Sequence, residues 1–202
     1  FRLKPGVDGI IQGASGLMSV TGAADGRPAK IQAPIVDMVT GMLATISVLD
    51  ALKVRTMTGR GAWLDISMYE AAIQLQQTGL AGFLANGETP VPCGSAAPYA
   101  APNEALRCAD GWIMLAAYHP SRWTALCEIL ECPELCFDIR FRDLAARIAN
   151  RGELVRLLEV RLTLRPRDEW IARFEALDII CAPINDYSEV VATPAFEDSQ
   201  MA

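Results

Sequence analysis

The chain has very little histidine and no closely paired cysteines. His119 is the only histidine in 202 residues, and none of the six cysteines forms a Cys-x-x-Cys pair. A zinc site usually requires closely spaced cysteine and histidine ligands, so the sequence predicts no bound metal. The best cysteine cluster is Cys127, Cys132 and Cys136, and Pro133 breaks the helix that would align these three side chains. We therefore expect buried, reduced thiols in a cytoplasmic protein.

Two further classes of partner are disfavoured by what the sequence lacks. The net charge is −6 and no cluster of lysine and arginine offsets it, so we expect no nucleic-acid partner. No uninterrupted apolar run reaches the roughly 18 residues that suggest a membrane span, so we expect no membrane partner. The 51% of hydrophobic residues is enough for one or two packed cores. The chain begins without methionine or a signal-peptide pattern, and we expect it to be a piece of a longer chain.

The N-terminal region is rich in glycine but carries no dinucleotide motif. Glycine recurs from residue 5 to residue 28 without the spacing G-x-G-x-x-G, and no strand precedes the run. Turns and close backbone approaches explain these glycines equally well.

A long helix and a shorter one are predicted in the first half of the chain. Apolar residues recur at helical spacing from 39 to 52, which predicts a helix from Met38 to about Arg55. The residues between them are also small or apolar, so we expect this helix to be buried. Residues 62–68 alternate in polarity and predict a strand. Ser67 and Glu70 form a capping-box pattern for a helix that would run to about residue 84.

The second half predicts a smaller lobe of mixed structure. Residues 86–103 hold four prolines and no helical period, which indicates a linker or loop. Beyond them, strands are expected at 110–118 and 179–184, and helices from Pro120, at about 151–163, at about 167–177 and after a Ser188 cap. This order of elements predicts a small α+β lobe.

Asp37 is the one carboxylate inside the apolar run "APIVDMVTGML" (33–43). An aspartate ahead of the first apolar residue of a helix is a standard N-cap. A carboxylate in an apolar pocket at a helix N-terminus could also stay ionised through the backbone N–H groups and act as a nucleophile or base. The residues alone favour the cap and leave both interpretations open.

Several segments, taken in order, resemble one family. They are "PGVDGIIQGASGLMSVTG", "APIVDMVTGMLATISVLDAL", "TGRGAWLDISMYEAA", "APNEALRCADGWIMLAAYHPSRWTALC" and, nearer the C-terminus, "NRGELVRLL" and "RDEWIARFEALDIICAPINDYSEV". Together they resemble the class III CoA-transferases (the CaiB/BaiF type), such as formyl-CoA transferase and the carnitine CoA-transferase.

The resemblance implies an α/β fold and an interlocked homodimer. Residues 1–85 would be the remainder of a large Rossmann-like domain that carries the catalytic aspartate. Residues 86–103 would be a linker and active-site loop. Residues 104–202 would be a small α+β domain with the start of a return linker.

The resemblance also implies the chemistry. The nucleophilic aspartate of the family stands in the segment matched by Asp37. Its carboxylate attacks an acyl-CoA thioester, and a mixed anhydride and an aspartyl-CoA thioester follow, so that CoA moves from one acid to another. Coenzyme A and acyl-CoA would be substrates, and no cofactor would be bound permanently. The apolar flanks of Asp37 would help to exclude water.

The expected CoA contacts lie in two places. The segment that matches the family just before the glycine-rich stretch brings Lys4, Pro5, Gly6 and Val7 close to the CoA, where Lys4 could meet a phosphate or carbonyl oxygen. Met68 matches a position that lines the CoA site. The alternatives are a solvated terminal lysine and an ordinary core methionine.

Two departures from the family bear on the reaction. Related α-methylacyl-CoA racemases carry a catalytic histidine where this chain has Val7, which can be neither acid nor base. The glycine run that closes over the active site of formyl-CoA transferase is reduced here to Gly94, and Tyr99 could line the acyl pocket. A racemase-like enzyme and a non-catalytic interaction scaffold remain the alternatives to a CoA-transferase. We assign no catalytic role to His119, which is expected to be solvated.

Overall fold

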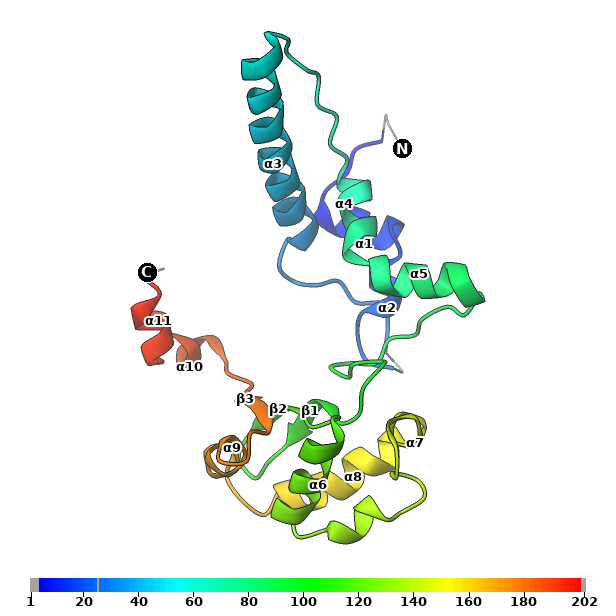
Figure 1. Cartoon of the computed structure of the whole chain (residues 1–202), viewed down its shortest axis with the longest axis vertical. Coiled ribbons are helices and arrows are strands. Elements are labelled where there is room, and N and C mark those ends of the chain that lie inside the picture. The colour runs from blue at the N-terminus through cyan, green and yellow to red at the C-terminus, as the bar shows by residue number, and fades with distance from the viewer. Residues whose placement is uncertain (1–3, 25, 201–202) are drawn as a thin grey trace. The chain divides into compact units, whose positions relative to one another are not determined.

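The computed structural model describes residues 4–24 and 26–200 and combines many helices with one small sheet (Figure 1). The chain divides into two compact units, residues 1–94 and residues 95–202.

The described part of the first unit is built from helices and extended segments. The glycine-rich region, expected to form turns, includes two short helices. Gly16 precedes the second of these helices in the left-handed conformation, with φ of 86°, which glycine adopts without strain. The helices are α1 (Asp8–Ala14), α2 (Leu17–Val20), α3 (Ile35–Thr58), α4 (Met68–Leu75) and α5 (Gln77–Asn86).

Helix α3 is longer than predicted and is not buried by the described residues. It begins at Ile35 and ends at Thr58, where Gly59 terminates it with φ of 72°. Apolar side chains along it are exposed, with Met42 at 59% and Ile46 at 63% of their full accessibility. The prediction of a buried helix is therefore wrong for this chain. Small and apolar side chains do project from all sides of α3. Helices α1 and α4 contact only part of it, so much of this apolar surface is left exposed.

Helix α3 is also the one described helix that is long and apolar enough to cross a membrane. Its most apolar window has a mean hydropathy of 1.7, and 6% of that window is buried. Core helices of soluble proteins and signal sequences can be equally long and apolar, so these two properties do not by themselves assign α3 to a membrane. The sequence prediction of no membrane partner stays a prediction.

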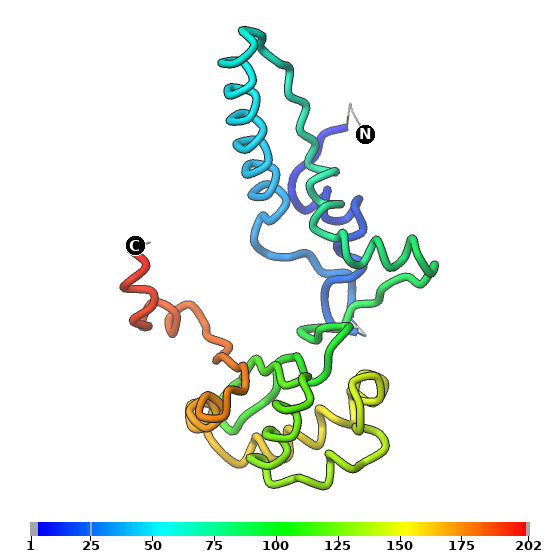
Figure 2. Tube along the Cα trace, in the orientation of Figure 1, coloured from blue at the N-terminus to red at the C-terminus, as the bar shows by residue number. Residues whose placement is uncertain are grey.

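The segment after α3 is extended but is not a strand. The chain returns from the end of α3 to α4 as an open stretch (Figure 2). The strand predicted at 62–68 is wrong, because residues 60–67 have no strand pairing in the described chain. Ser67 does cap α4, accepting a hydrogen bond from the N–H of Glu70 at 3.3 Å. The single predicted helix is two helices, since α4 ends at Leu75 and α5 begins at Gln77.

The second unit holds a three-stranded antiparallel sheet in the order β1-β2-β3. Leu106 pairs with Ile113 across β1 and β2, and these two residues with Leu115 form its buried face. Strand β1 was not predicted, because "NEALR" shows no apolar alternation beyond Ala105 and Leu106. The elements are β1 (Asn103–Arg107), β2 (Trp112–Ala116), α6 (Pro120–Ile129), η1 (Pro133–Cys136), α7 (Leu144–Ala149), α8 (Arg151–Leu162), α9 (Arg167–Glu175), β3 (Ile180–Pro183), α10 (Tyr187–Val191) and α11 (Pro194–Asp198).

One apolar core fills this unit. Helix α8 contributes Leu154, Leu158 and Leu162 at intervals of four residues, so all three lie on one face. Helix α9 adds Trp170 and Phe174, whose rings stack with centroids 5.6 Å apart. The predicted helices from Pro120, at 151–163 and at 167–177 and the strand at 179–184 are confirmed in position. The core thus rests on the residues whose periodicity predicted these elements.

The cap of α10 differs from the prediction. Asp186, not Ser188, accepts the N–H of Glu189 at 2.9 Å, and the Glu189 carboxylate accepts the N–H of Asp186 in return. The Ser188 hydroxyl donates to Asp186 instead. Asp186, two residues before Ser188, is the cap because its side chain forms one half of the reciprocal pair of a capping box.

Leu158→Ala tests the core of the second unit. Leu158 is fully buried, and its truncation leaves a cavity, so we expect a loss of about 2–5 kcal/mol in the free energy of unfolding. Val160→Ala on the same helix is the control, because Val160 is 55% exposed and its loss should cost within about 0.5 kcal/mol. Urea unfolding of both variants measures the difference, and equal losses would contradict the described packing.

Candidate active site

The N-terminus of α3 is closed by a carboxylate from another helix. Asp8, the first residue of α1, accepts hydrogen bonds at Oδ2 from the backbone N–H of Val36 at 2.8 Å and of Asp37 at 3.2 Å. Pro34, at the N-cap position of α3, makes no side-chain cap. Asp37 is the third residue of the helix, so its predicted role as N-cap is wrong. Asp8 performs that role from a distance of 29 residues in sequence.

Gln12 holds Asp8 in position. It is fully buried one turn further along α1, and its Nε2 donates to Asp8 Oδ1 at 2.6 Å. The same amide donates to the carbonyl oxygen of Ile31 at 3.1 Å and accepts the N–H of Ile31 at 2.9 Å. One buried side chain thus fixes both the capping carboxylate and the loop that leads into α3.

The backbone of Asp37 is fixed, whereas its carboxylate is exposed. The N–H groups of Ile35 and Met38 donate to nearby backbone carbonyl oxygens at 2.7 and 3.0 Å, and Asp8 takes the two between them. The N–H groups expected to stabilise the Asp37 carboxylate are therefore used elsewhere. The expected apolar pocket is not formed by the described residues either, since the side chain is exposed. Its place in the first turn of α3 still favours negative charge.

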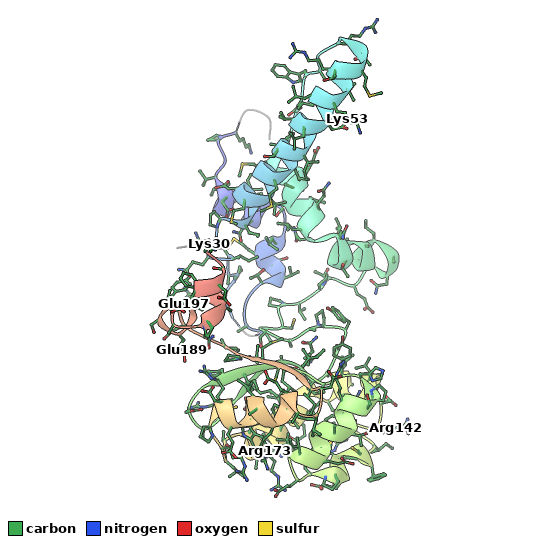
Figure 3. The ribbon with its side chains drawn as sticks, turned by 60° about the vertical axis from the view of Figure 1, so that its left-hand side comes forward. Lys30, Lys53, Arg142, Arg173, Glu189 and Glu197 are labelled. Carbon is green, nitrogen blue, oxygen red and sulfur yellow. The ribbon has the colours of Figure 1, made fainter. Side chains whose placement is uncertain are left out.

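The pKa of the Asp8 carboxyl is lowered. Burial raises it, but hydrogen bonds from Gln12 and from the N–H groups of Asp37 and Val36, with the charge of Lys30, together lower the pKa by more. Lys30 lies on the loop before α3 (Figure 3). Asp8 is therefore ionised at neutral pH and serves as an acceptor only.

The residues expected to contact CoA lie partly around this cap. Residues 4–7 are exposed and lead directly into Asp8, and the carbonyl oxygen of Val7 accepts the N–H groups at the start of α1. Met68 is half-buried and is the first residue of α4, not the end of a strand. Helix α4 contacts both α1 and α3. The structure thus gathers residues 4–7, Met68 and Asp37 on neighbouring elements of one unit.

Gly94 and Tyr99 belong to different units. Gly94 has φ of 64°, and its N–H donates to the carbonyl oxygen of Gly22 at 2.8 Å, within residues 1–94. Tyr99 lies in the second unit and is 69% exposed. A shared acyl pocket for these two residues stays a prediction.

Two arginines that the sequence analysis did not single out hold the segment around Tyr99. Arg151 at the start of α8 donates to the carbonyl oxygens of Ala97 and Ala100 at 2.6 and 2.7 Å. Arg147 on α7 donates to that of Ala101 at 2.8 Å. These bonds fix the residues on both sides of Tyr99 while its ring remains exposed. Arg147 and Arg151 are four residues apart in the sequence, as "R-x-x-x-R". Nothing in that spacing identifies their partners, which are carbonyl oxygens some 50 residues away.

Arg151 also pairs with the buried carboxylate of Glu104 on β1. The Glu104 side chain is 4% exposed, and burial raises the pKa of its carboxyl more than the charge and hydrogen bond of Arg151 lower it. Removal of Arg151 would leave that carboxyl buried without its cationic partner.

The part of the chain that the structure describes contains no group of three or more histidine, cysteine or acidic side chains arranged to hold a metal ion. His119 precedes α6, is exposed, and its Nδ1 lies 2.9 Å from the hydroxyl of Ser121.

The fold and site define a class: a chain of helices with a small sheet, in which an aspartate stands in the first turn of a long apolar helix. The chain belongs to CoA-transferase family III, whose model matches residues 2–202. It is 30% identical over 98% of its length to a succinyl-CoA:mesaconate CoA-transferase of Haloarcula hispanica and covers 49% of that protein. It is 30% identical over 94% of its length to an acetyl-CoA:oxalate CoA-transferase of Acetobacter aceti and again covers 49% of it.

A solved structure supports the same family. The crystal structure of a CAIB/BAIF family protein from Brucella suis matches 98% of this chain with a TM-score of 0.85 and 33% sequence identity. This chain covers 52% of that one. The chain therefore spans about half the length of the relatives that it matches.

Asp8→Ala tests the capping carboxylate. Because it leaves two N–H groups at the head of α3 without an acceptor, we expect the free energy of unfolding to fall by about 1 kcal/mol at pH 7. The folded pKa of Asp8 is lowered, so the stability that it contributes is present above its unfolded pKa of about 3.9 and is lost as pH falls through the folded pKa. Unfolding and helical circular dichroism at pH 7 and pH 3 should show the gap to wild type narrowing at pH 3. Asp50→Ala, on the exposed surface of α3, is the control, and an equal loss there would contradict the cap.

Arg151→Met tests the clamp on residues 97–101. It leaves Glu104 buried and unpaired, so we expect about 3–5 kcal/mol of destabilisation. Because the pKa of Glu104 is raised in the folded state, that state takes up the proton first as pH falls, and the loss should shrink toward pH 5. Arg156→Met removes an exposed, solvent-screened pair with Glu153 and should change the stability little. Thermal unfolding at two pH values measures both, and a loss for Arg151→Met no larger than for Arg156→Met would refute the clamp.

Proposed function

We propose that the protein transfers CoA from an acyl-CoA thioester to a carboxylic acid, with Asp37 as the nucleophile. The observation that carries the proposal is the position of Asp37 in a family III chain: its backbone is held by Asp8, and its carboxylate is free at the head of α3. A carboxylate whose backbone is fixed and whose oxygens are not consumed by the cap can approach an acyl carbon.

The reaction balances in four steps without water. An oxygen of Asp37 attacks the thioester carbon, the C–S bond breaks, and CoA departs as the thiolate. The product is a mixed anhydride between Asp37 and the acyl group. The thiolate attacks the Asp37 carbonyl carbon, which releases the first acid and forms an aspartyl-CoA thioester. The acceptor carboxylate attacks that carbon and releases the thiolate again. The thiolate then attacks the acceptor acyl carbon, which gives the new acyl-CoA and regenerates Asp37. Water must be excluded, because it would hydrolyse the anhydride.

The substrates are an acyl-CoA donor and a small carboxylic acid. Relatives named for mesaconate and oxalate support the acid as a class, and the acid used by this chain is left unassigned. Lys4, Pro5, Gly6, Val7 and Met68 are proposed to contact CoA, and Gly94 and Tyr99 to line the acyl site. No resident cofactor is needed for these steps.

An interlocked homodimer in the cytoplasm is part of the proposal. Apolar side chains of α3, such as Met42, Ile46 and Leu49, are exposed. This exposure supports packing of α3 against protein outside the two described units. Such cover would also supply the dry surroundings that the Asp37 carboxylate lacks in the described residues.

A racemase requires an acid and a base on opposite sides of the α-carbon. Val7 can be neither, and the neighbouring Asp8 is held ionised and occupied by the cap. A non-catalytic scaffold would bind neither substrate. Incubation of a 2-methylacyl-CoA in deuterated water identifies a racemase, since only a racemase exchanges the α-hydrogen, and a measurement of CoA binding identifies a scaffold.

Asp37→Asn tests the nucleophile in the full-length protein. It keeps the size and backbone contacts but turns the anionic carboxylate into a neutral, weakly nucleophilic amide, so we expect CoA exchange across a panel of acyl-CoA donors and free acids to fall by about 10³-fold or more. Asp50→Asn, at another exposed position of α3, should exchange at the wild-type rate. Full activity of Asp37→Asn would show that another group carries the chemistry, and loss in both variants would point to the helix.

A further inference from the structure

A cavity of about 470 Å³ lies within the second unit, where α6 and α7 begin. Aromatic and apolar side chains form part of its wall, and charged side chains form another part. The lining includes Tyr118, Pro120, Trp123, Arg142, Leu144 and Arg147. This volume and this mixture of an apolar wall with a few polar groups are typical of sites for small molecules. None of these residues is among those proposed to react or to contact CoA.

Arg147 is a buried cation whose hydrogen-bond partners carry no net charge. It is 2% exposed, and its guanidinium donates to the carbonyl oxygens of Ala101, Phe141 and Tyr118 at 2.8, 3.1 and 3.0 Å. Among the described residues, no carboxylate forms an ion pair with it. A buried charge is costly unless an opposite charge accompanies it. Arg147 therefore lacks the counter-charge that usually accompanies a buried cation.

The acidic side chain that lines the cavity, Asp143, is already engaged. Its Oδ1 accepts the N–H of Ala146 at 2.8 Å as the cap of α7, and its Oδ2 pairs with Nε of Arg142 at 3.2 Å. Burial lowers the pKa of Arg147, and the charges of neighbouring groups, Asp143 among them, raise it by less. Of the lysine, arginine and acidic side chains, Arg142 (Figure 3), Arg147 and Asp143 line the cavity, which leaves one positive charge in excess.

Trp123 adds a donor without an acceptor beside this cation. It is 4% exposed, and Cζ of Arg147 lies 5.0 Å from the centroid of its ring. The indole Nε1–H is buried and has no hydrogen-bond partner in the part of the chain that the structure describes. A buried donor without an acceptor costs free energy, which an entering acceptor would recover. The residues that line the cavity thus include both an uncompensated cation and an unsatisfied donor.

We propose that this cavity binds a small organic carboxylate. The anionic group of the ligand supplies the charge that Arg147 lacks and accepts the indole N–H of Trp123. A guanidinium has five N–H groups, and the three carbonyl oxygens take up three of those of Arg147. The apolar part of the ligand lies against Pro120 and Leu144. An inorganic anion would leave this apolar wall uncovered, and a multiply charged ligand would exceed the one positive charge in excess.

Titration of the full-length protein with benzoate and with hexanoate tests the proposal. The protein is labelled with ¹⁵N at its tryptophan indoles, and the resonance that disappears in Trp123→Phe is that of Trp123. Both acids should shift this resonance saturably. Benzyl alcohol and hexanol keep the apolar part but lack the charge, so we expect them to bind at least about tenfold more weakly.

Two controls locate the binding. The indole resonance of Trp112, which is 46% exposed on β2 and outside the cavity, should not move with either acid. Arg142→Gln removes one cation and leaves Asp143 without its partner, so benzoate should bind about threefold more weakly in the same titration. Arg156→Gln removes a similarly exposed, paired arginine outside the cavity and should bind benzoate as wild type does.

Other results would overturn the proposal. They are a Trp123 resonance that neither acid shifts, benzyl alcohol or inorganic phosphate that binds there as tightly as benzoate, or equal weakening by Arg142→Gln and Arg156→Gln. Circular dichroism of each variant confirms that it is folded. The wild-type titrations decide the ligand class if Arg142→Gln is not folded, and none of these readouts depends on CoA transfer.

Discussion

The hydrogen bonds from the head of α3 to Asp8 are the constraint on which the candidate site depends. A helix N-terminus exposes N–H groups that need acceptors, and Pro34 makes no side-chain cap. Because Asp8 supplies the acceptor from α1, the cap also fixes where α1 lies against α3. Gln12 extends the same network to the loop at Ile31. The carboxylate of Asp37 is left out of this network, which separates the group that holds the helix from the group proposed to react.

In the second unit, cationic side chains provide hydrogen-bond partners for backbone groups that lie outside regular secondary structure. Its sheet and helices share an apolar core, but the segment before β1 has carbonyl oxygens that no strand satisfies. Arg147 and Arg151 reach these oxygens, and the buried carboxylate of Glu104 balances the charge of Arg151. These hydrogen bonds anchor the backbone on both sides of Tyr99, in the stretch where formyl-CoA transferase has its glycine run. It exposes Tyr99 between anchored residues without requiring flexible backbone.

Periodicity correctly predicted the helices whose apolar faces are buried within the described part of the chain. Helices α6, α8 and α9 bury residues such as Trp123, Leu158 and Phe174, and their patterns were informative for that reason. The same pattern misled at α3, whose apolar surface finds little cover within the described residues. The strand expected at 62–68 needed a neighbouring strand, which sequence alternation alone cannot supply. Asp8 and Gln12 were missed because their partners lie 19 to 29 residues away and carry no local signal.

The succession of matching segments along the sequence indicates the family. The role proposed for Asp37 is a covalent step, which isotopic labelling can follow. The most direct measurement is turnover of the full-length protein with an acceptor acid labelled with ¹⁸O in its carboxylate. When CoA thiolate attacks the acceptor acyl carbon of the mixed anhydride, the bridging oxygen remains with the enzyme. The account predicts ¹⁸O in the peptide that carries Asp37 after turnover. Label that appears in no aspartate, or in Asp8 and not in Asp37, would contradict it.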